Sequence, residues 1–313
     1  MLGEFIFDEP PFKSCHSPTV AMTDVGLIVA CFAGNFEGHS KTSIWTSARI
    51  DGRWTEPLMV ANGKQKSGRP YACWNPVLYR NETGSILLFY KVGKSPSQWW
   101  GMLMSSSDQG VSWSEPTKLP RDVYGPTKNK PIRLMNGKLL CPASDEKYDW
   151  WKVYFDIMSD EGWRRIQAPN PRDYGVIQPT ILRHSKDTLQ ALCRSENGCI
   201  VESWSYDDGI TWEPLSGTEL PNPNSGIDAV SLKVDKHLLV YNATNYGRSS
   251  LVVALSEDGK KWEDIVTLED GGGEFSYPSV INSPDGLVHI VYTWNRSNIK
   301  YVMLDESDLS IQV

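Results

Sequence analysis

Six positions in the sequence put a polar residue directly before a proline or alanine that opens an apolar segment. These residues are Ser17, Asn75, Lys130, Gln178, Asp228 and Tyr277. Other ionisable or hydrogen-bonding groups lie near these segments: His16, Glu37, Lys128, Arg194, Asn242 and Arg248. Arginine and lysine can bind an anionic ligand, whereas Asp, Glu, His and Tyr can transfer protons. If the fold brings them together, this set could bind an acidic molecule and catalyse a reaction on it.

Tryptophan marks the first of two repeats in the chain. Each repeated tryptophan closes a short polar turn, and the intervals are 49 to 59 residues: Trp54, Trp113, Trp163, Trp212 and Trp262. The clearest turn is Ser205-Tyr206-Asp207-Asp208-Gly209-Ile210-Thr211-Trp212. In such a turn Asp can accept hydrogen bonds from backbone N–H groups, Gly can adopt a positive φ, and Trp can pack the turn onto a sheet. Five copies indicate a repeat architecture.

The polar residue followed by Pro or Ala forms a second repeat, in step with the first. After each of its six copies comes a turn and then a second apolar strand, for example Leu189–Arg194 and Leu287–Trp294. A period of ~40–50 residues with about four short strands per unit predicts a propeller blade. We therefore expect an all-β, six-bladed β-propeller with four-stranded antiparallel blades, as a single domain over residues 1–313. Each proline is expected to hold the residue before it extended.

Propeller geometry predicts where the polar residues meet. The innermost strand of each blade lines the central channel, starts on one face of the disc, and is followed by a strand that returns to that face. The six residues before Pro or Ala should form a ring there. Arg194 and Asn242 should join it from the ends of second strands, Glu37 from a loop and Arg248 from the start of a third strand. The Asp-containing turns should lie on the opposite face and be structural. A channel residue can also simply fill the pore and pair with its neighbours.

These Asp-containing turns and the inner-strand pattern resemble the sialidase (neuraminidase) superfamily over nearly the whole chain. Four stretches are similar to the bacterial and plant predicted neuraminidases with BNR repeats: Cys73-Trp74-Asn75-Pro76, Trp99-Trp100-Gly101-Met102, Lys128-Asn129-Lys130-Pro131 and Asn222-Pro223-Asn224-Ser225-Gly226-Ile227-Asp228. The resemblance implies three arginines that hold a sugar carboxylate, a Tyr nucleophile activated by Glu, and an Asp acid/base. It places Tyr277 at the nucleophile, Arg194 at the second arginine and Arg248 at the third.

The sequence departs from that pattern at three places. His16 stands where the first arginine would be, Gln178 replaces the Glu that would activate the tyrosine, and Glu37-Gly38-His39 occupies the acid/base loop. Gln cannot accept a proton from a phenol of pKa ~10. An acid/base pair could instead be built from Glu37 and Asp228, with His16 assisting. Carboxyl groups ~5–5.5 Å apart would favour a retaining route, and ~6.5–9.5 Å would favour inversion.

We therefore expect a glycosidase, namely an exo-acting, sialidase-like hydrolase that releases a terminal, acidic sugar from a glycan or oligosaccharide. The catalytic candidates are Tyr277, Asp228, Glu37, His16 and Gln178. The substrate-binding candidates are Arg194, Arg248, Lys130, Lys128, Asn75, Asn242 and Trp100, whose indole could stack on a sugar ring. Two alternatives stay open. One is a polysaccharide lyase acting on a uronate, with His16 or Tyr277 as base, and the other is a non-catalytic carbohydrate-binding propeller.

Composition narrows the range of partners. The net charge is −7 and no basic run occurs, which argues against general binding of nucleic acid. No window approaches ~18 apolar residues, so no membrane span is expected. The six cysteines form no CxxC pair and no Gly-rich phosphate loop is present, so neither a metal nor a cofactor is expected. Met1–Pro10 does not resemble a secretory signal, which favours the cytoplasm unless a leader has been trimmed. Propellers of this kind often act as monomers, and a monomer is the expectation here.

Overall fold

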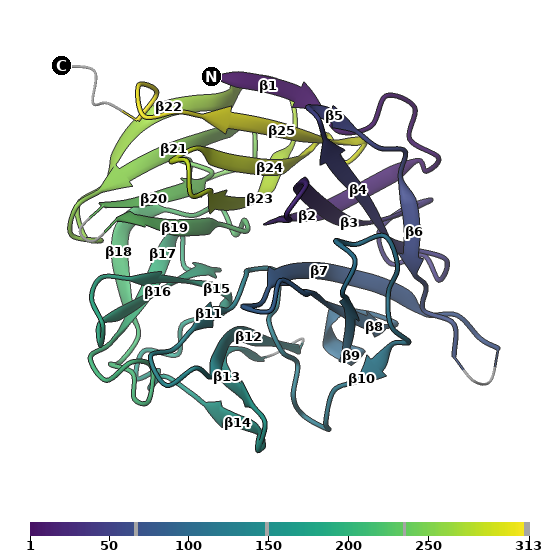
Figure 1. Ribbon diagram of the computed structural model, residues 1–313. Coiled ribbons are helices and arrows are strands. Elements are labelled where there is room, and N and C mark those ends of the chain that lie inside the picture. The colour runs from purple at the N-terminus through teal and green to yellow at the C-terminus, as the bar shows by residue number, and fades with distance from the viewer. Residues whose placement is uncertain (66–67, 148–149, 234–235, 310–313) are drawn as a thin grey trace.

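Six antiparallel sheets are arranged as blades around a central axis (Figure 1). The computed structural model describes residues 1–65, 68–147, 150–233 and 236–309. Nearly all regular structure in these ranges is strand, and the helical element found in them is the short 3-10 helix η1, Pro96–Gln98. The prediction of an all-β, six-bladed propeller is therefore confirmed.

Each blade runs from an innermost strand at the axis to an outermost strand at the rim of the disc (Figure 1). In that order the strands are, for blade 1, β2 Ser14–Met22, β3 Gly26–Gly34, β4 Ser43–Ile50, and β5 Arg53–Trp54 with β6 Leu58–Ala61; for blade 2, β7 Ala72–Arg80, β8 Ile86–Gly93, β9 Trp99–Ser106 and β10 Thr117–Lys118; for blade 3, β11 Ile132–Arg133, β12 Leu139–Lys147, β13 Trp150–Ser159 and β14 Gly162–Ile166; for blade 4, β15 Val176–Arg183, β16 Leu189–Ser195, β17 Cys199–Ser205 and β18 Ser216–Pro221; for blade 5, β19 Asp228–Lys233, β20 Lys236–Tyr241, β21 Ser250–Ser256 and β22 Glu263–Asp270; and for blade 6, β23 Phe275–Asn282, β24 Val288–Trp294, β25 Asn298–Leu304 and β1 Leu2–Phe5. Blade 1 has a fifth strand because β5 and β6 both pair with β4.

Blade 6 is built from both ends of the chain. Its outermost strand, β1, pairs antiparallel with β25, from Leu2 opposite Met303 to Phe5 opposite Lys300. The N-terminal ammonium group also lies 3.0 Å from the Asp308 carboxylate. Hydrogen bonds between the first and last strands of the chain thus close the ring (Figure 1).

The hydrophobic core lies between the blades. Each sheet is covered on both faces by its neighbours, so its middle strands carry apolar residues on both faces, and every residue of β16 is buried. Between blades 3 and 4, Phe155 stacks on Trp212 with ring centroids 3.7 Å apart, in a cluster that also contains Leu189. Trp212 closes an Asp-containing turn, so this contact fastens the turn to the core.

The Asp-containing turns join the third and fourth strands of their blades. Asp207 accepts hydrogen bonds from the Thr211 backbone N–H at 2.8 Å and from the Ser205 hydroxyl at 2.9 Å. Gly209 has a φ of +83°, as the turn requires. These contacts are internal to the turn, which fits the structural role that the repeat predicts.

Four of the six channel-lining strands carry a β-bulge at the X-Pro pair. The residues before these prolines have φ values between +38° and +54°: Ser17, Asn75, Gln178 and Tyr277. The register shifts at each of them, so that the X-Pro pair lies opposite one residue of the next strand. The prediction that they are extended is therefore wrong. Regular pairing on both sides holds the extra residue in a costly conformation, and the bulge re-aims its side chain. Lys130 instead precedes β11, and Asp228 begins β19.

Candidate functional site

Tyr277 and Arg194 are in direct contact. Arg194 lies at the end of β16, and its Nη1 donates a hydrogen bond to Tyr277 Oη at 2.6 Å and lies 3.3 Å from Gln178 Oε1. Its Nε donates to Asn224 Oδ1 at 2.7 Å. Arg194, Tyr277 and Gln178 are all buried. Among the described residues, no carboxylate forms an ion pair with Arg194, in contrast to Arg248 and the arginine that lies beside it.

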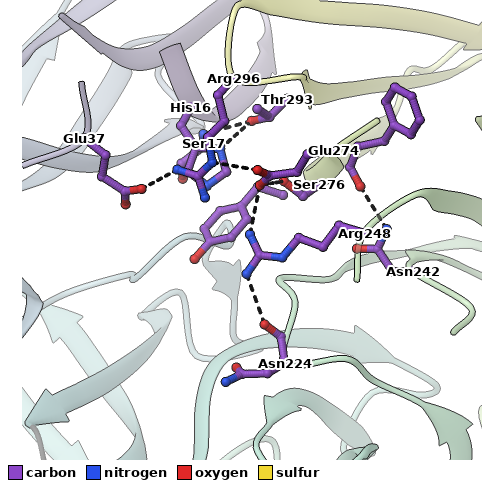
Figure 2. A network of polar contacts seen from close by, with 12 residues as sticks. His16, Ser17, Glu37, Asn224, Asn242, Arg248, Glu274, Ser276, Thr293 and Arg296 are labelled. Atoms are coloured by element: carbon purple, nitrogen blue, oxygen red, sulfur yellow. Dashed lines mark hydrogen bonds and ion pairs between the residues drawn. The ribbon is translucent and has the colours of Figure 1, made fainter. Parts of the chain in front are cut away.

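Two further arginines reach this site, and Glu274 joins them (Figure 2). The Oε1 of Glu274 accepts a hydrogen bond from Arg248 Nη1 at 3.1 Å, and its Oε2 accepts one from Arg296 Nε at 2.8 Å. Arg296 also pairs with Glu37 through Nη1. Burial pushes the pKa of Glu274 upward, but the hydrogen bond and charge of Arg296 and the charge of Arg248 outweigh it, so this pKa is lowered. The Arg248 guanidinium lies 5.6 Å from the centre of the Tyr277 ring.

His16 packs against the ring of Tyr277 with centroids 4.2 Å apart. Its Nδ1 lies 2.9 Å from Thr293 Oγ1. Burial, together with the positive charges of Arg296 and its neighbours, holds the pKa of His16 well below the usual value. His16 is therefore neutral near pH 7 and cannot replace the charge of an arginine. Arg296, whose charge acts on His16 more strongly than any other, supplies positive charge on this side of the site.

A buried carboxyl group, that of Glu146, lies beside Gln178. Glu146 is 8% exposed, and its Oε1 accepts hydrogen bonds from Gln178 Nε2 at 3.1 Å and from Ser144 Oγ at 3.0 Å. The first of these bonds orients the Gln178 amide with its oxygen toward Arg194. Burial raises the pKa of Glu146, although Arg194 and the two hydrogen bonds oppose that rise. The site therefore contains a carboxyl group that gives up its proton less readily than a surface glutamate.

Asp228 lies in a buried network that joins four blades. Its carboxylate oxygens are 3.0 and 2.9 Å from Lys130 Nζ, and they also accept from Thr180 Oγ1 at 2.7 Å and from the Val280 backbone N–H at 2.9 Å. The side chain of Asp228 is 1% exposed, and that of Lys130 is 17% exposed. These partners occupy the carboxylate, so the geometry favours a structural role for Asp228 and Lys130 over proton transfer.

Lys128 and Asn242 bind backbone carbonyl groups of blades 5 and 6. The Nζ of Lys128 donates to the Ile227 carbonyl at 2.6 Å and to the Pro278 carbonyl. Burial lowers the pKa of Lys128 to about 7. The Nδ2 of Asn242 donates to the carbonyls of Ser250 and Phe275 at 2.7 and 2.8 Å. Both side chains therefore tie blades together near the axis.

The structure places Trp100 in a different part of the molecule. Trp100 lines a groove formed by the outer strands of blades 1 and 2, together with Trp113 and Met102, and Lys118 lies over its ring at 4.6 Å. None of the described residues that contact Tyr277 lines this groove. Trp100 is therefore not brought together with the other predicted residues, whereas Asn75 is buried at its bulge on the channel-lining strand β7.

Three charged residues of the site were not among those predicted: Glu146, Glu274 and Arg296. Arg296 follows the predicted second strand Leu287–Trp294, the same kind of position that identified Arg194. Glu146 is the residue before last of β12, the second strand of blade 3. A search of the residues at the end of each second strand and just after it would have found both.

Two features are absent from the ranges that the structure describes. No group of three or more His, Cys, Asp or Glu residues there could hold a metal ion. No helix in those ranges has the length and apolar character needed to cross a membrane. The six cysteines are free, and five of them are buried.

Comparison with known proteins gives a family and a fold. Residues 26–290 match the BNR repeat-like domain family. No curated protein sequence matches the chain significantly. Among solved structures, the Hadza microbial sialidase Hz136 has a TM-score of 0.78 at 18% identity. The match covers 94% of this chain and 66% of the sialidase chain.

Two further structures match over nearly the full length of both chains. The intramolecular trans-sialidase from Ruminococcus gnavus, in complex with oseltamivir carboxylate, has a TM-score of 0.77 at 14% identity. The match covers 99% of this chain and 99% of the trans-sialidase chain. A protein of unknown function from Dyadobacter fermentans has a TM-score of 0.77 at 16% identity, with 97% of each chain covered. At such low sequence identities, the structural similarity shows that this chain shares its fold with these proteins. The protein therefore belongs to the BNR repeat-like domain family and has the fold of the sialidases.

Proposed function

We propose that this protein is an exo-acting glycoside hydrolase that releases a terminal acidic sugar from a glycan or oligosaccharide. The observation that carries the proposal is Arg194, a buried guanidinium that is fixed by Tyr277, Gln178 and Asn224 and has no carboxylate partner among the described residues. A buried charge that forms no direct ion pair is costly, so an anionic ligand would stabilise it. Arginine is also suited to binding a carboxylate through two parallel hydrogen bonds.

Arg248 and Arg296 would extend this cationic surface. Together with Arg194 they carry three positive charges, and Glu274 and Glu37 carry two negative charges, which leaves a net charge of +1 for one sugar carboxylate. Arg296 would take over the charge that is lost where His16 stands, since His16 itself stays neutral. This arrangement supports an acidic rather than a neutral terminal sugar.

Glu146 is the carboxyl group best suited to proton transfer, because Asp228 is occupied by its own network and Glu37 is paired with Arg296. A general acid must hold its proton near the working pH, and burial raises the pKa of Glu146 in that direction. Glu146 would donate this proton to the glycosidic oxygen. The hydroxyl oxygen of Tyr277 accepts a hydrogen bond from Arg194, and it would face the anomeric carbon of the bound sugar from the central axis of the propeller.

The test is a hydrolysis screen at pH 5–7 with 4-methylumbelliferyl glycosides of a sialic acid, of glucuronic acid and of rhamnose, beside natural acidic oligosaccharides. Arg194→Met would be compared with Arg133→Met, which removes an exposed arginine that pairs with Glu82. Hydrogen bonds to charged groups are worth ~1.5–3 kcal/mol, so kcat/KM should fall roughly 10- to 150-fold in the first variant and stay unchanged in the second.

Three other outcomes would contradict the proposal. Equal activity of Arg194→Met and wild type would remove the arginine from substrate binding. An unsaturated product that absorbs in the ultraviolet would indicate a lyase. Binding of an acidic sugar without turnover of any substrate would indicate a non-catalytic carbohydrate-binding propeller.

A further inference from the structure

A second cleft opens between blades 3 and 4 on the same face as Arg194. We call it the rim cleft, and its volume is about 620 Å³. It lies where β13 begins, where the loop before β15 ends, and at the hairpin between β16 and β17. Residues on its walls include Trp150, Trp151, Asp173, Tyr174, Glu196 and Asn197.

Trp151 connects the rim cleft to the site around Tyr277. The Arg194 guanidinium carbon lies 5.4 Å from the Trp151 ring and 5.7 Å from the Tyr277 ring. Arg194 is therefore close to both aromatic rings, and Trp151 belongs to both the rim cleft and the surroundings of Arg194. A molecule whose anionic end is held by Arg194 could extend past Trp151 into the rim cleft.

The walls of the rim cleft are held in place by hydrogen bonds between their two loops and within one of them. The Gly175 N–H donates to Asn197 Oδ1 at 3.2 Å, and the Glu196 N–H donates to the Gly175 carbonyl at 3.0 Å. Asn170 fixes Tyr174 by accepting from its N–H and donating to its carbonyl, at 3.0 and 2.9 Å. A preformed cleft of a few hundred Å³ is typical of small-molecule sites, because little ordering free energy is then spent on binding.

The chemistry of the rim cleft suits an uncharged sugar. Trp150 is 61% exposed and presents an apolar ring with the Lys152 ammonium group 4.3 Å from its centre. The apolar face of a pyranose can pack on such a ring while its hydroxyls reach polar groups. Asp173 and Glu196 are exposed on the wall of the cleft, so their carboxylates can accept hydrogen bonds from hydroxyls. Two carboxylates against one ammonium would repel a second acidic sugar.

From this arrangement we infer that the rim cleft binds the neutral sugar unit to which the terminal acidic sugar is attached. The inference rests on the proposed function for the identity of the acidic end, but the rim cleft itself can be tested without any turnover. It predicts a substrate in which an acidic sugar, held by the arginines, is followed by a neutral sugar that stacks on Trp150.

The first experiment measures binding of lactose and glucuronic acid by titration calorimetry to wild type, Trp150→Ala and Tyr206→Ala. Tyr206 has the same exposure as Trp150, 61%, but lies in an Asp-containing turn, which makes it a matched control. We expect lactose to bind wild type and Tyr206→Ala alike and to bind Trp150→Ala at least 10-fold more weakly. No binding of lactose, or equal binding to Trp150→Ala, would overturn the inference.

The second experiment compares an acidic-sugar aryl glycoside with the same acidic sugar linked to lactose. Trp150→Ala should lower kcat/KM at least 10-fold for the oligosaccharide and less than twofold for the aryl glycoside, which lacks the neutral sugar. Equal losses would overturn the inference. If wild type cleaves neither substrate, the proposed function fails, and the lactose titration still decides whether the rim cleft binds a neutral sugar.

Discussion

Replacing Asp228 with Asn tests whether this residue holds the propeller together or transfers protons. The substitution keeps the shape of the side chain but removes its charge and one of its two acceptor oxygens. Four hydrogen-bond contacts surround the carboxylate, three of them from Lys130 and Thr180 and one from the Val280 N–H. An amide cannot accept from all of these donors, and its NH₂ group would face at least one of them.

The expected cost follows from the burial of this ion pair. Breaking a fully buried pair costs ~3–5 kcal/mol. The Lys130 side chain is 17% exposed and keeps a hydrogen bond to the Ala229 carbonyl at 2.8 Å, so water and this carbonyl recover part of the loss. We therefore expect Asp228→Asn to lower the free energy of unfolding by about 2–3 kcal/mol.

Urea unfolding followed by tryptophan fluorescence measures this loss. With an m value of roughly 2–3 kcal/mol per M, the midpoint should fall by about 1 M. Glu82→Gln is the matched control, because Glu82 is 62% exposed and pairs with an exposed arginine, so its midpoint should shift by less than about 0.3 M. A midpoint for Asp228→Asn equal to that of the control would refute the structural role. Loss of turnover at unchanged stability would return Asp228 to the acid/base candidates.

Three further substitutions probe other parts of the molecule. Glu146→Gln should lower kcat/KM about 100-fold or more for glycosides with poor leaving groups and far less for 4-nitrophenyl glycosides, which need no proton; equal losses would assign Glu146 to positioning alone. The pKa of Lys128 is lowered to about 7 in the folded state, below the ~10.4 of an unfolded chain, so this group makes stability rise with pH between those values by up to about 1.4 kcal/mol per pH unit. In urea titrations from pH 7 to 10, the stability of Lys128→Met should rise less steeply than that of wild type, and parallel curves would speak against the lowered pKa of Lys128. Trp212→Ala should cost ~3–5 kcal/mol in the same assay, whereas Trp212→Phe should cost much less because the indole N–H has no hydrogen-bond partner among the described residues; similar losses would contradict the stacking argument.

The repeats were sufficient to predict the fold, because each turn and each X-Pro pair has its own local physical reason and the period counts the blades. The positions of Tyr277, Arg194 and Arg248 followed from the same geometry. The partners of each group could not be predicted. Asp228 fits a catalytic pattern by its neighbours in sequence, and only the folded ring shows that Lys130, two blades away, occupies its carboxylate.

The backbone conformation of the channel-lining strands was the second feature that could not be predicted from the sequence. A residue before proline prefers an extended conformation when considered alone. Here the pairing of two long strands on either side of the X-Pro pair imposes the bulge, and tertiary structure overrides the local preference. Because the bulge turns Gln178 and Tyr277 toward Arg194, this local deviation determines which side chains meet.

The closure of blade 6 by β1 also bears on how the protein avoids association with copies of itself. Without residues 2–5, the N–H and C=O groups of β25 that pair with β1 would form an open strand edge. Such edges recruit strands from other molecules. The first strand of the chain thus protects β25 from pairing with other molecules. A chain that lacks β1, or one whose N-terminal segment detaches on heating, would be expected to associate with other copies through β25. The other five blades would stay folded.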